Sequence, residues 1–363
     1  MPVILDNAPE AFDDFYEPFV GGGAVFTAVD AKRIFINDKS TELASLYKAI
    51  ASQDGSFFKW LEAVVTAWDS VMAFVADNRH LCDLYVRFRN GDIDDKAVTE
   101  DLQAFARLNA NGIDAILPPG FEWCREDFDS EVERSLTHKF KRMAKIERER
   151  KTMPDGDIFD NIETAFTGAL YTYLRALYND VRRKGQTGLS TALFVFMRNY
   201  AYSGMFRYNA DGDFNVPYGG ITYNHKSLSA KIAYYSSTEL LRHLSKTTIE
   251  SLDFEDFFNL HQPSERDFVF LDPPYDTEFS TYARNEFTRD DQKRLADYLC
   301  NRCKAKWMLI IKHTPFIHAL YDQDGVVIRK FDKKYSVSFM NRNDRDVEHL
   351  LIMNYNRRQG ATP

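Results

Sequence analysis

The sequence predicts an α/β fold in which one doubly wound, mostly parallel sheet is interrupted by a long helical insertion. Short apolar runs typical of buried strands occur near both ends of the 363-residue chain, for example at residues 33–37 and 267–271. Between about residues 55 and 185 apolar residues recur at helical spacing, with no convincing strand. We therefore expect a sheet domain built from residues 1–54 and 236–363, and an inserted domain at residues 55–235.

The first elements follow from the apolar pattern and from the glycines. A strand at residues 15–18 leads into a turn at Gly21, Gly22 and Gly23, and the apolar residues 24–26 then predict the start of a helix. A second strand at residues 33–37 ends at Asp38, and helical spacing follows at residues 40–50.

The later elements are predicted in the same way. Residues 162–184 have the clearest amphipathic helix pattern of the insertion, and a segment rich in Asn, Gly and aromatics follows at residues 198–223. A helix is expected at residues 288–303, because Thr288 is a good N-cap and acidic residues fill its first turn. The remaining strands are expected at residues 267–271, 306–312, 326–330 and 349–355.

Composition narrows the class of protein. The net charge is -8, 44% of the residues are hydrophobic, and no run approaches the roughly 20 apolar residues of a membrane helix. With no secretory pattern at the start, we expect a soluble, cytoplasmic protein with no membrane partner. The four cysteines, Cys82, Cys124, Cys300 and Cys303, complete no zinc-binding pattern, and we expect no metal ion.

One segment is basic against this acidic average. Residues 134–151 hold eight Lys or Arg and only two Glu. The run formed by Lys139, Lys141, Arg142 and Lys145 is therefore a candidate phosphate-contact face. The alternative interpretation is an ordinary solvated face of a helix.

The strongest chemical motif is Asp272-Pro273-Pro274-Tyr275, directly after an apolar strand. Ligands of open α/β sheets bind at the carboxyl ends of strands. The Asp272 carboxylate and a proline carbonyl can both accept hydrogen bonds from an exocyclic amine, and Tyr275 can stack on a planar base. A base inside a duplex would first have to be flipped out. A simple proline-rich turn is the alternative.

Three further segments are candidates for binding a nucleoside. A glycine-rich turn lets a cofactor approach the backbone closely, and here it follows Glu17-Pro18-Phe19. Asp38, at the end of the next strand, can bind the two hydroxyls of a ribose. Asp253-Phe254 can read an adenine edge, through a carboxylate and a backbone N–H.

This ordered set of motifs resembles the Dam-type (group alpha) DNA adenine-N6 methyltransferases. The resemblance rests on residues 17–23, 36–38 with 42–43 and 46–47, 198–219 and 272–275. Residues further along the chain also match, at Tyr282, 287–295, 314–321 and 350–355. It implies a Rossmann-like fold that depends on S-adenosylmethionine, with an inserted, mainly helical target-recognition domain. The implied reaction is methyl transfer to the N6 amine of a flipped-out adenine in a specific double-stranded DNA sequence.

The resemblance also implies a set of functional residues. Catalysis would fall to Asp272, Pro273, Pro274 and Tyr275. The residues implied to bind S-adenosylmethionine are Glu17, Pro18, Phe19, Gly21, Gly23, Asp38, Asp253, Phe254 and Asp272. Those implied to bind DNA lie on a hairpin at residues 198–223 and are Tyr202, Arg207, Asn209, Asn215 and Pro217. No metal is required, because the sulfonium already activates the methyl group.

The sequence departs from the family at its start. Family members usually carry a Lys-aromatic-Gly segment about a dozen residues before the Glu-Pro-Phe turn, and Met1-Pro2-Val3-Ile4 does not match it. We therefore expect weak cofactor binding by the chain alone, with a second chain as one way to complete the pocket. The alternatives are a catalytically silent DNA-binding subunit and a methyltransferase acting on a protein glutamine. A cognate restriction enzyme is a further expected partner.

Overall fold

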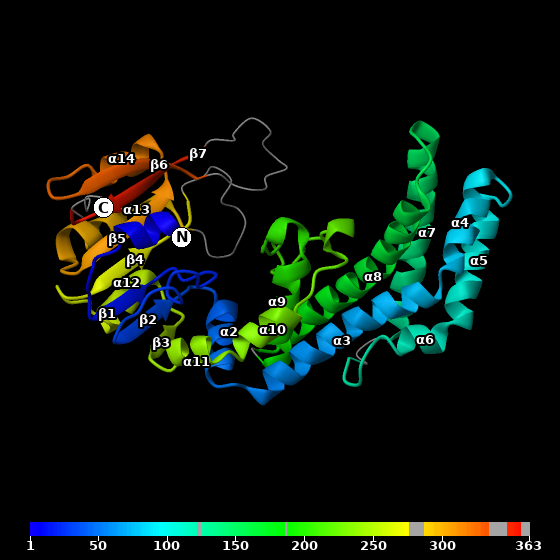
Figure 1. Cartoon of the computed structure of the whole chain (residues 1–363), viewed down its shortest axis with the longest axis horizontal. Helices are drawn as coiled ribbons and strands as arrows, with labels where there is room; N and C mark the ends of the chain where they lie inside the picture. Colours follow the sequence, from blue (N-terminus) through cyan, green and yellow to red (C-terminus); the bar gives the residue numbers. More distant parts are fainter. Residues whose placement is uncertain (122–124, 186, 276–286, 334–346, 357–363) are drawn as a thin grey trace, which may run out of the picture. The chain divides into compact units, whose positions relative to one another are not determined.

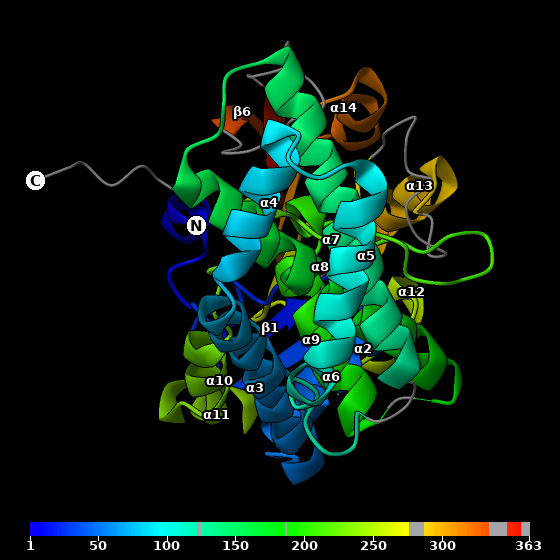
Figure 2. The same ribbon diagram turned by 90° about the vertical axis from the view of Figure 1, so that its right-hand side faces the viewer.

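The computed structural model describes residues 1–121, 125–185, 187–275, 287–333 and 347–356. Cys124 and Tyr282 lie outside these ranges. The chain divides into two compact units (Figures 1 and 2). Unit 1 comprises Met1–Gln53 and Tyr234–Pro363, and unit 2 comprises Asp54–Ala233.

Unit 1 is built on a seven-stranded sheet with the order β3-β2-β1-β4-β5-β7-β6. Strands β1 to β5 pair in parallel, whereas β7 lies antiparallel between β5 and β6. The order reverses between β1 and β4, so the expected doubly wound topology is confirmed. The strands are β1 (Asp14–Glu17), β2 (Arg33–Asn37), β3 (Thr247–Glu250), β4 (Phe268–Leu271), β5 (Lys306–Lys312), β6 (Val327–Lys333) and β7 (Val347–Met353).

Both faces of this sheet are covered, which explains the nearly continuous apolar runs in its central strands. Alternate residues such as Val269, Leu271 and Trp307 enter one core cluster, together with side chains of the helices that follow β3, β4 and β5. Phe268 and Phe270 alternate with them along the strand and are buried on the opposite face.

Two helices of unit 1, α2 and α13, lie where the sequence predicted helices. Ser40 accepts a hydrogen bond from the Leu43 N–H and begins the helix expected at residues 40–50. The helix expected at residues 288–303 ends earlier, at Asp297, and continues as a π-helical turn, η4 (Tyr298–Arg302). The α-helices are α1 (Pro2–Asn7), α2 (Thr41–Ala51), α11 (Thr238–Leu244), α12 (Phe254–Leu260), α13 (Arg289–Asp297) and α14 (Pro315–Tyr321), and α10 (Ser229–Tyr235) crosses the boundary between the units.

The helix expected to start at residues 24–26 does not form, so that expectation was wrong. Residues 24–28 form turns instead. Gly21 and Gly23 have φ values of 48° and 73°, outside the helical region. The Phe26 N–H donates to the Glu17 carboxylate rather than to a carbonyl four residues earlier. The conformations of the glycines and the hydrogen bond to the buried Glu17 therefore prevent the helix that the apolar pattern predicts.

Unit 2 is helical, as expected for the insertion. Its two longest helices, α7 and α8, pack along one another (Figure 1). No helix in the described part of the chain is long and apolar enough to cross a membrane. The helices are α3 (Gly55–Asp77), α4 (His80–Asn90), α5 (Asp95–Leu108), α6 (Ala110–Asp114), α7 (Arg125–Glu149), α8 (Asp155–Arg183) and α9 (Gly188–Tyr200), with short turns η2 (Tyr202–Gly204) and η3 (Ile221–Tyr223).

Candidate active site and nucleic-acid interface

The carboxyl ends of β1, β2, β3 and β4 lie side by side at one edge of the sheet. These strands are consecutive neighbours in the sheet and run parallel, so the segments that follow them meet there. The segments are the glycine turn after Glu17, Asp38 after Asn37, the Asp253-Phe254 pair, and Asp272–Tyr275. Because the strand order reverses between β1 and β4, this is the edge where ligands of such sheets bind.

Glu17 ends β1 with a carboxyl group that is only 2% exposed. One of its oxygens accepts the Phe26 N–H at 2.8 Å, which fastens the far end of the glycine turn to the strand. Burial raises the pKa of Glu17 well above its usual value, and the nearby Asp272 carboxylate raises it further. The electrostatic effect of Asp272 shows that two of the predicted site segments come close together.

Asp38 holds the near end of the same turn. Its two carboxylate oxygens accept the N–H groups of Gly21 at 3.0 Å and Ser40 at 2.9 Å. The Tyr47 hydroxyl donates to the Gly21 carbonyl at 3.0 Å. A Cβ on Gly23 would lie 2.5 Å from both the Phe26 ring and the Tyr47 oxygen, so this position requires glycine. The turn is thus fixed by Glu17 of β1, by Asp38 directly after β2 and by Tyr47 of α2.

Asn37 is a residue whose role was missed at the sequence level. It is 2% exposed, and its amide donates to the carbonyls of Pro18 at 3.1 Å and Leu252 at 3.0 Å. Its amide oxygen accepts the Leu252 N–H at 2.8 Å. One side chain thereby ties the segments after β1, β2 and β3 together. Only its place beside Asp38 at a strand end hinted at this.

The pair Asp253-Phe254 begins α12. Asp253 caps the helix by accepting the Glu255 N–H at 3.0 Å, and it forms an ion pair with Arg294 at 2.7 Å. Phe254 packs with Phe19 and Phe287, with ring centroids 5.4 to 5.9 Å apart. The three rings therefore form an aromatic cluster beside the strand ends. Phe287 and Arg294 were not among the predicted site residues.

The Asp272–Tyr275 segment directly follows β4 and has no regular secondary structure. Asp272 and Pro274 are exposed, Pro273 is buried, and Tyr275 is half-buried. The Tyr275 ring packs edge-on against the buried His349 of β7, with centroids 5.6 Å apart. The Pro274 carbonyl accepts a hydrogen bond from the Gln292 amide of α13 at 2.9 Å. The buried Gln292 side chain thus contacts the motif, whose first residue, Asp272, is exposed.

The predicted DNA-binding residues lie in unit 2, where residues 201–218 fold back on themselves. Antiparallel bridges join Ala201 to Tyr218 and Tyr208 to Phe214. Helix α8 holds this hairpin, because the Asn179 amide exchanges two hydrogen bonds with the Phe214 backbone, at 2.8 and 3.1 Å.

In the second half of the hairpin, exposed and buried residues alternate along the chain. Asn215 and Pro217 are exposed and Val216 is buried between them, whereas Tyr202 and Arg207 are half-buried. The Asn209 side-chain oxygen accepts the Asp213 N–H at 2.8 Å, so this predicted DNA contact also builds the turn of the hairpin.

The basic segment lies on α7 and divides between two faces. Lys141, Arg142 and Lys145 are exposed, and none of them forms an ion pair with an acid in the described ranges. Lys139 is different, because it is half-buried and its Nζ lies 3.5 Å from Asn161 of α8. Burial lowers the pKa of Lys139, and the Arg142 charge lowers it further. The exposed face therefore omits Lys139.

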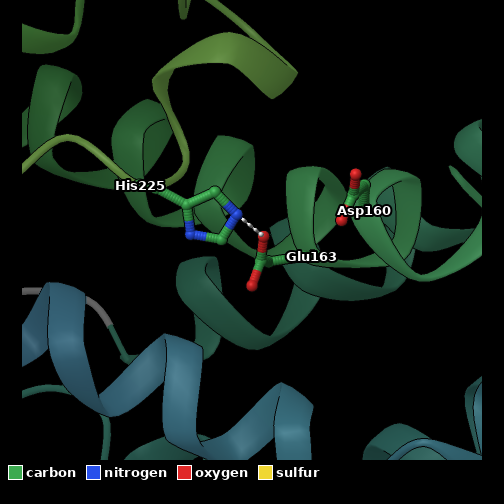
Figure 3. A group of neighbouring side chains, drawn as sticks. All are labelled: Asp160, Glu163 and His225. Atoms are coloured by element: carbon green, nitrogen blue, oxygen red, sulfur yellow. Dashed lines mark ion pairs between the residues drawn. The ribbon is translucent and has the colours of Figure 1, made fainter. Parts of the chain in front are cut away.

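A group of polar side chains joins α8 to the segment after η3 (Figure 3). Asp160 and Glu163 of α8 and His225 bring their ligand atoms within 4.8 Å of one another. The buried Glu163 carboxylate accepts the Asn224 amide at 3.0 Å and faces the His225 ring nitrogen at 3.6 Å. Burial raises the pKa of Glu163, against the lowering effect of His225. These contacts fasten the segment after η3 to α8.

The sheet order, with β7 antiparallel between β5 and β6, and the polar segments at its carboxyl edge define a Rossmann-like methyltransferase fold. A family model described as D12 class N6 adenine-specific DNA methyltransferase matches residues 1–110 and 134–337. The chain belongs to this family.

Individual proteins with similar sequences are also methyltransferases or adenine methylases. The chain is 34% identical over 166 residues to the type II methyltransferase M.CviBI of Paramecium bursaria Chlorella virus NC1A, covering 45% of this chain and 60% of the relative. It is 32% identical over 138 residues to the retron Ec67 DNA adenine methylase of Escherichia coli, covering 37% and 45%. It is 28% identical over 192 residues to a DNA adenine methylase of Vibrio cholerae serotype O1, covering 49% and 65%. The chain thus spans about half the length of the curated relatives it matches.

Proposed function

We propose that this protein transfers a methyl group from S-adenosylmethionine to the N6 amine of an adenine in a specific double-stranded DNA sequence. It would act as a site-specific, adenine-specific DNA methyltransferase. The observation that carries the proposal is the place of Asp272-Pro273-Pro274-Tyr275 in a family member: it follows β4 at the reversal of the strand order, beside the glycine turn after β1.

The residues at the sheet edge fit S-adenosylmethionine. A Cβ built on Gly21 or Gly22 would meet nothing within 4 Å, so the backbone of the turn borders open space into which a ligand can fit. We propose that Glu17, Pro18, Phe19, Gly21 and Gly23 form one wall of the pocket. Asp38 would bind the ribose, since a carboxylate oxygen can accept more than one hydrogen bond. Asp253, Phe254 and Asp272 would complete the site. When bound, the cofactor supplies an activated methyl group.

The protein's own contribution would be to hold the amine. The adenine nitrogen is a poor nucleophile because its lone pair is delocalised into the ring. Two acceptors, the Asp272 carboxylate and a carbonyl of the Pro273-Pro274 pair, would hold its hydrogens and favour a pyramidal nitrogen. Tyr275, fixed edge-on by His349, would stack on the flipped base. Orientation of the amine toward the methyl group would then supply much of the rate.

Unit 2 would read the DNA. We propose that Tyr202, Arg207, Asn209, Asn215 and Pro217 of the hairpin contact the target sequence, with Arg207 pairing with a guanine edge. The exposed side chains of α7 would contact phosphates, which position the duplex without reading its sequence. A cognate restriction enzyme and a second chain that completes the cofactor pocket remain proposed protein partners.

The test is methyl transfer from labelled S-adenosylmethionine to duplex DNA, followed by identification of the methylated nucleoside. Asp272→Ala is expected to lower turnover by more than tenfold, a loss above about 1.4 kcal/mol, because one of the two amine acceptors disappears. Binding of duplex DNA should stay close to that of the unmodified protein, because phosphate contacts lie elsewhere.

Asp256→Ala is the matched control, because Asp256 is an exposed acid on α12 of the same unit. It should leave turnover unchanged. If Asp272→Ala keeps more than about a tenth of the turnover, the role of Asp272 is wrong. If the unmodified protein labels a glutamine instead of DNA, or binds DNA without methylating it, the proposed function is wrong.

A further inference from the structure

Gln292 contacts the Asp272–Tyr275 segment but has no role in the proposed function as described so far. It lies in the second turn of α13 and is only 1% exposed. Its amide nitrogen donates to the Pro274 carbonyl at 2.9 Å. That carbonyl belongs to the peptide that joins Pro274 to Tyr275. Fixing it therefore fixes the direction in which the chain enters Tyr275.

This hydrogen bond holds a segment that has few free backbone torsions. The rings of Pro273 and Pro274 already hold their φ angles near -65°. The main freedom left in the segment is rotation of the peptide planes that follow each ring. The Gln292 bond holds the second of these planes, while pairing of β4 with β5 holds the chain before Asp272. The segment is thus fixed at both ends.

Packing alone does not require an amide at this position. The Gln292 side-chain oxygen is buried and has no hydrogen-bond partner among the residues that the structure describes. Its neighbours along the helix include the buried Leu295 and Ala296. A leucine has a similar volume and would leave no unpaired oxygen, but it would also remove the donor to the Pro274 carbonyl. Because Pro274 is exposed, water can replace that donor, and the loss of stability should be small. What glutamine adds is the bond to the Pro274 carbonyl.

Helix α13 is attached to the sheet independently of this bond. Arg294 forms ion pairs with Asp253 and Glu255, each at 2.7 Å, and Leu295 enters the core cluster of the sheet. Loss of the Gln292 bond should therefore release the proline segment without detaching the helix.

We propose that Gln292 is a positioning residue for methyl transfer, which holds the Asp272–Tyr275 segment in the geometry that receives the amine. The inference rests on the proposed function. It assigns to Gln292 no contact with DNA or cofactor. Its removal should therefore lower kcat and leave cofactor binding nearly unchanged.

The first experiment compares Gln292→Leu with the unmodified protein. We expect kcat for methyl transfer to fall by about 10–100-fold, the range that a small misplacement of reacting groups produces. The Kd for S-adenosylmethionine and the urea midpoint should change little. Gln323→Leu is the control, because Gln323 is an exposed glutamine of the same unit that donates to the Leu320 carbonyl at 2.8 Å. It should have no effect on kcat.

The second experiment uses Gln292→Glu, which keeps the shape and makes the donor depend on pH. A protonated carboxyl can donate to the Pro274 carbonyl, whereas a carboxylate cannot. The ratio of kcat in this variant to kcat in the unmodified protein should therefore rise as pH falls. This pH dependence also tests the role of Gln292 if Gln292→Leu does not fold, because it is measured within the Gln292→Glu variant.

Unchanged kcat in Gln292→Leu overturns the inference, as does a pH-independent ratio for Gln292→Glu. A loss of kcat that only follows a matching loss of folded protein would assign Gln292 a purely structural role and overturn it as well. Failure of the proposed function is distinct, because the unmodified protein would then transfer no methyl group to DNA in the same assay.

Discussion

Glu17 is the most deeply enclosed acid at the proposed cofactor site, and its environment opposes its charge. Its carboxyl group is held by one backbone donor, Phe26, and by no basic side chain in the described part of the chain. Burial is the main cause of its raised pKa, followed by the Phe26 N–H, which lowers the pKa, and by Asp272, which raises it. The ionised form therefore weakens the fold.

The Glu17→Gln variant should become more stable relative to the unmodified protein as pH rises. Since the folded pKa lies above the unfolded value near 4.5, the stabilising effect of the neutral carboxyl is complete below that value. This stabilisation is lost as pH rises through the folded pKa. The loss is about 1.4 kcal/mol for each pH unit that separates the unfolded pKa from the folded pKa. Glutamine keeps the acceptor for Phe26 and does not titrate. Urea unfolding should show the variant gaining on the unmodified protein as pH rises from 4.5 to 8.

The comparison uses the difference between two proteins at each pH, so other titrating groups cancel. Glu265→Gln, at an exposed position before β4, serves as the control and should show no such trend. A difference that stays constant with pH would show that Glu17 titrates at its ordinary pKa.

At the scale of elements, strong apolar periodicity was enough to predict most of the sheet. β2 and β5 fall where the pattern placed them, because both are buried on two faces and read as continuous apolar runs. β3 was missed, because its residues Thr247–Glu250 are only half-buried and three of the four are polar. It is an edge strand, and its place depends on pairing with β2.

The candidate site was likewise predictable only in part from the sequence. Asp272 and Asp38 could be found because acids follow apolar strands at positions where sheets bind ligands. Asn37, Gln292 and Arg294 could not be assigned roles, because each acts on a segment distant in the chain. Asn37, for example, bonds to Leu252, 215 residues away. Such partners are set by the folded topology, and no local pattern records them.

Helix α7 carries a prediction at this scale. The exposed residues Lys141, Arg142 and Lys145 lie on one face, within about one helical turn. Replacing all three by alanine should weaken DNA binding equally for all sequences and should reduce the salt slope of log K by about 2–3, because each phosphate contact contributes roughly 0.9. Fluorescence anisotropy from 50 to 200 mM salt, on two unrelated duplexes, measures both effects.

The control for this variant is Lys96→Ala on α5, where the lysine is exposed but lies 3.6 Å from Glu100. Its effect on the salt slope should be negligible. An unchanged slope in the triple variant would identify the α7 face as merely solvated.

At the scale of the whole molecule, unit 1 is assembled from two stretches of chain separated by all of unit 2. The two stretches meet where unit 2 is inserted, because the Gln53 amide donates to the Tyr235 carbonyl at 3.2 Å. The sheet core contains residues from both stretches, such as Tyr16 and Trp307. Unit 1 therefore has the connectivity needed to close without the insertion.

We expect a variant in which a short Gly/Ser linker replaces residues 54–233 to fold cooperatively. Its urea m-value should be lower than that of the full chain, because m scales with the surface exposed on unfolding. It should still bind S-adenosylmethionine and should lose sequence-dependent DNA binding. Circular dichroism during urea titration and calorimetry with cofactor measure these properties. Gradual unfolding without a transition would show that unit 1 needs the insertion to fold.

The pairing of β1 with β4 also has a consequence for the order of events during synthesis. β1 leaves the ribosome early together with β2, but its other neighbour follows only after the entire insertion. The Asp14 N–H and the Asp267 carboxylate, 253 residues apart in the chain, are bonded at 3.1 Å beside this pairing. Unit 2, whose contacts are contained within one stretch, can fold while the nascent chain still lacks β4. Until then one edge of β1 is open, so the sheet is exposed to mispairing during translation and depends on the last third of the chain to close.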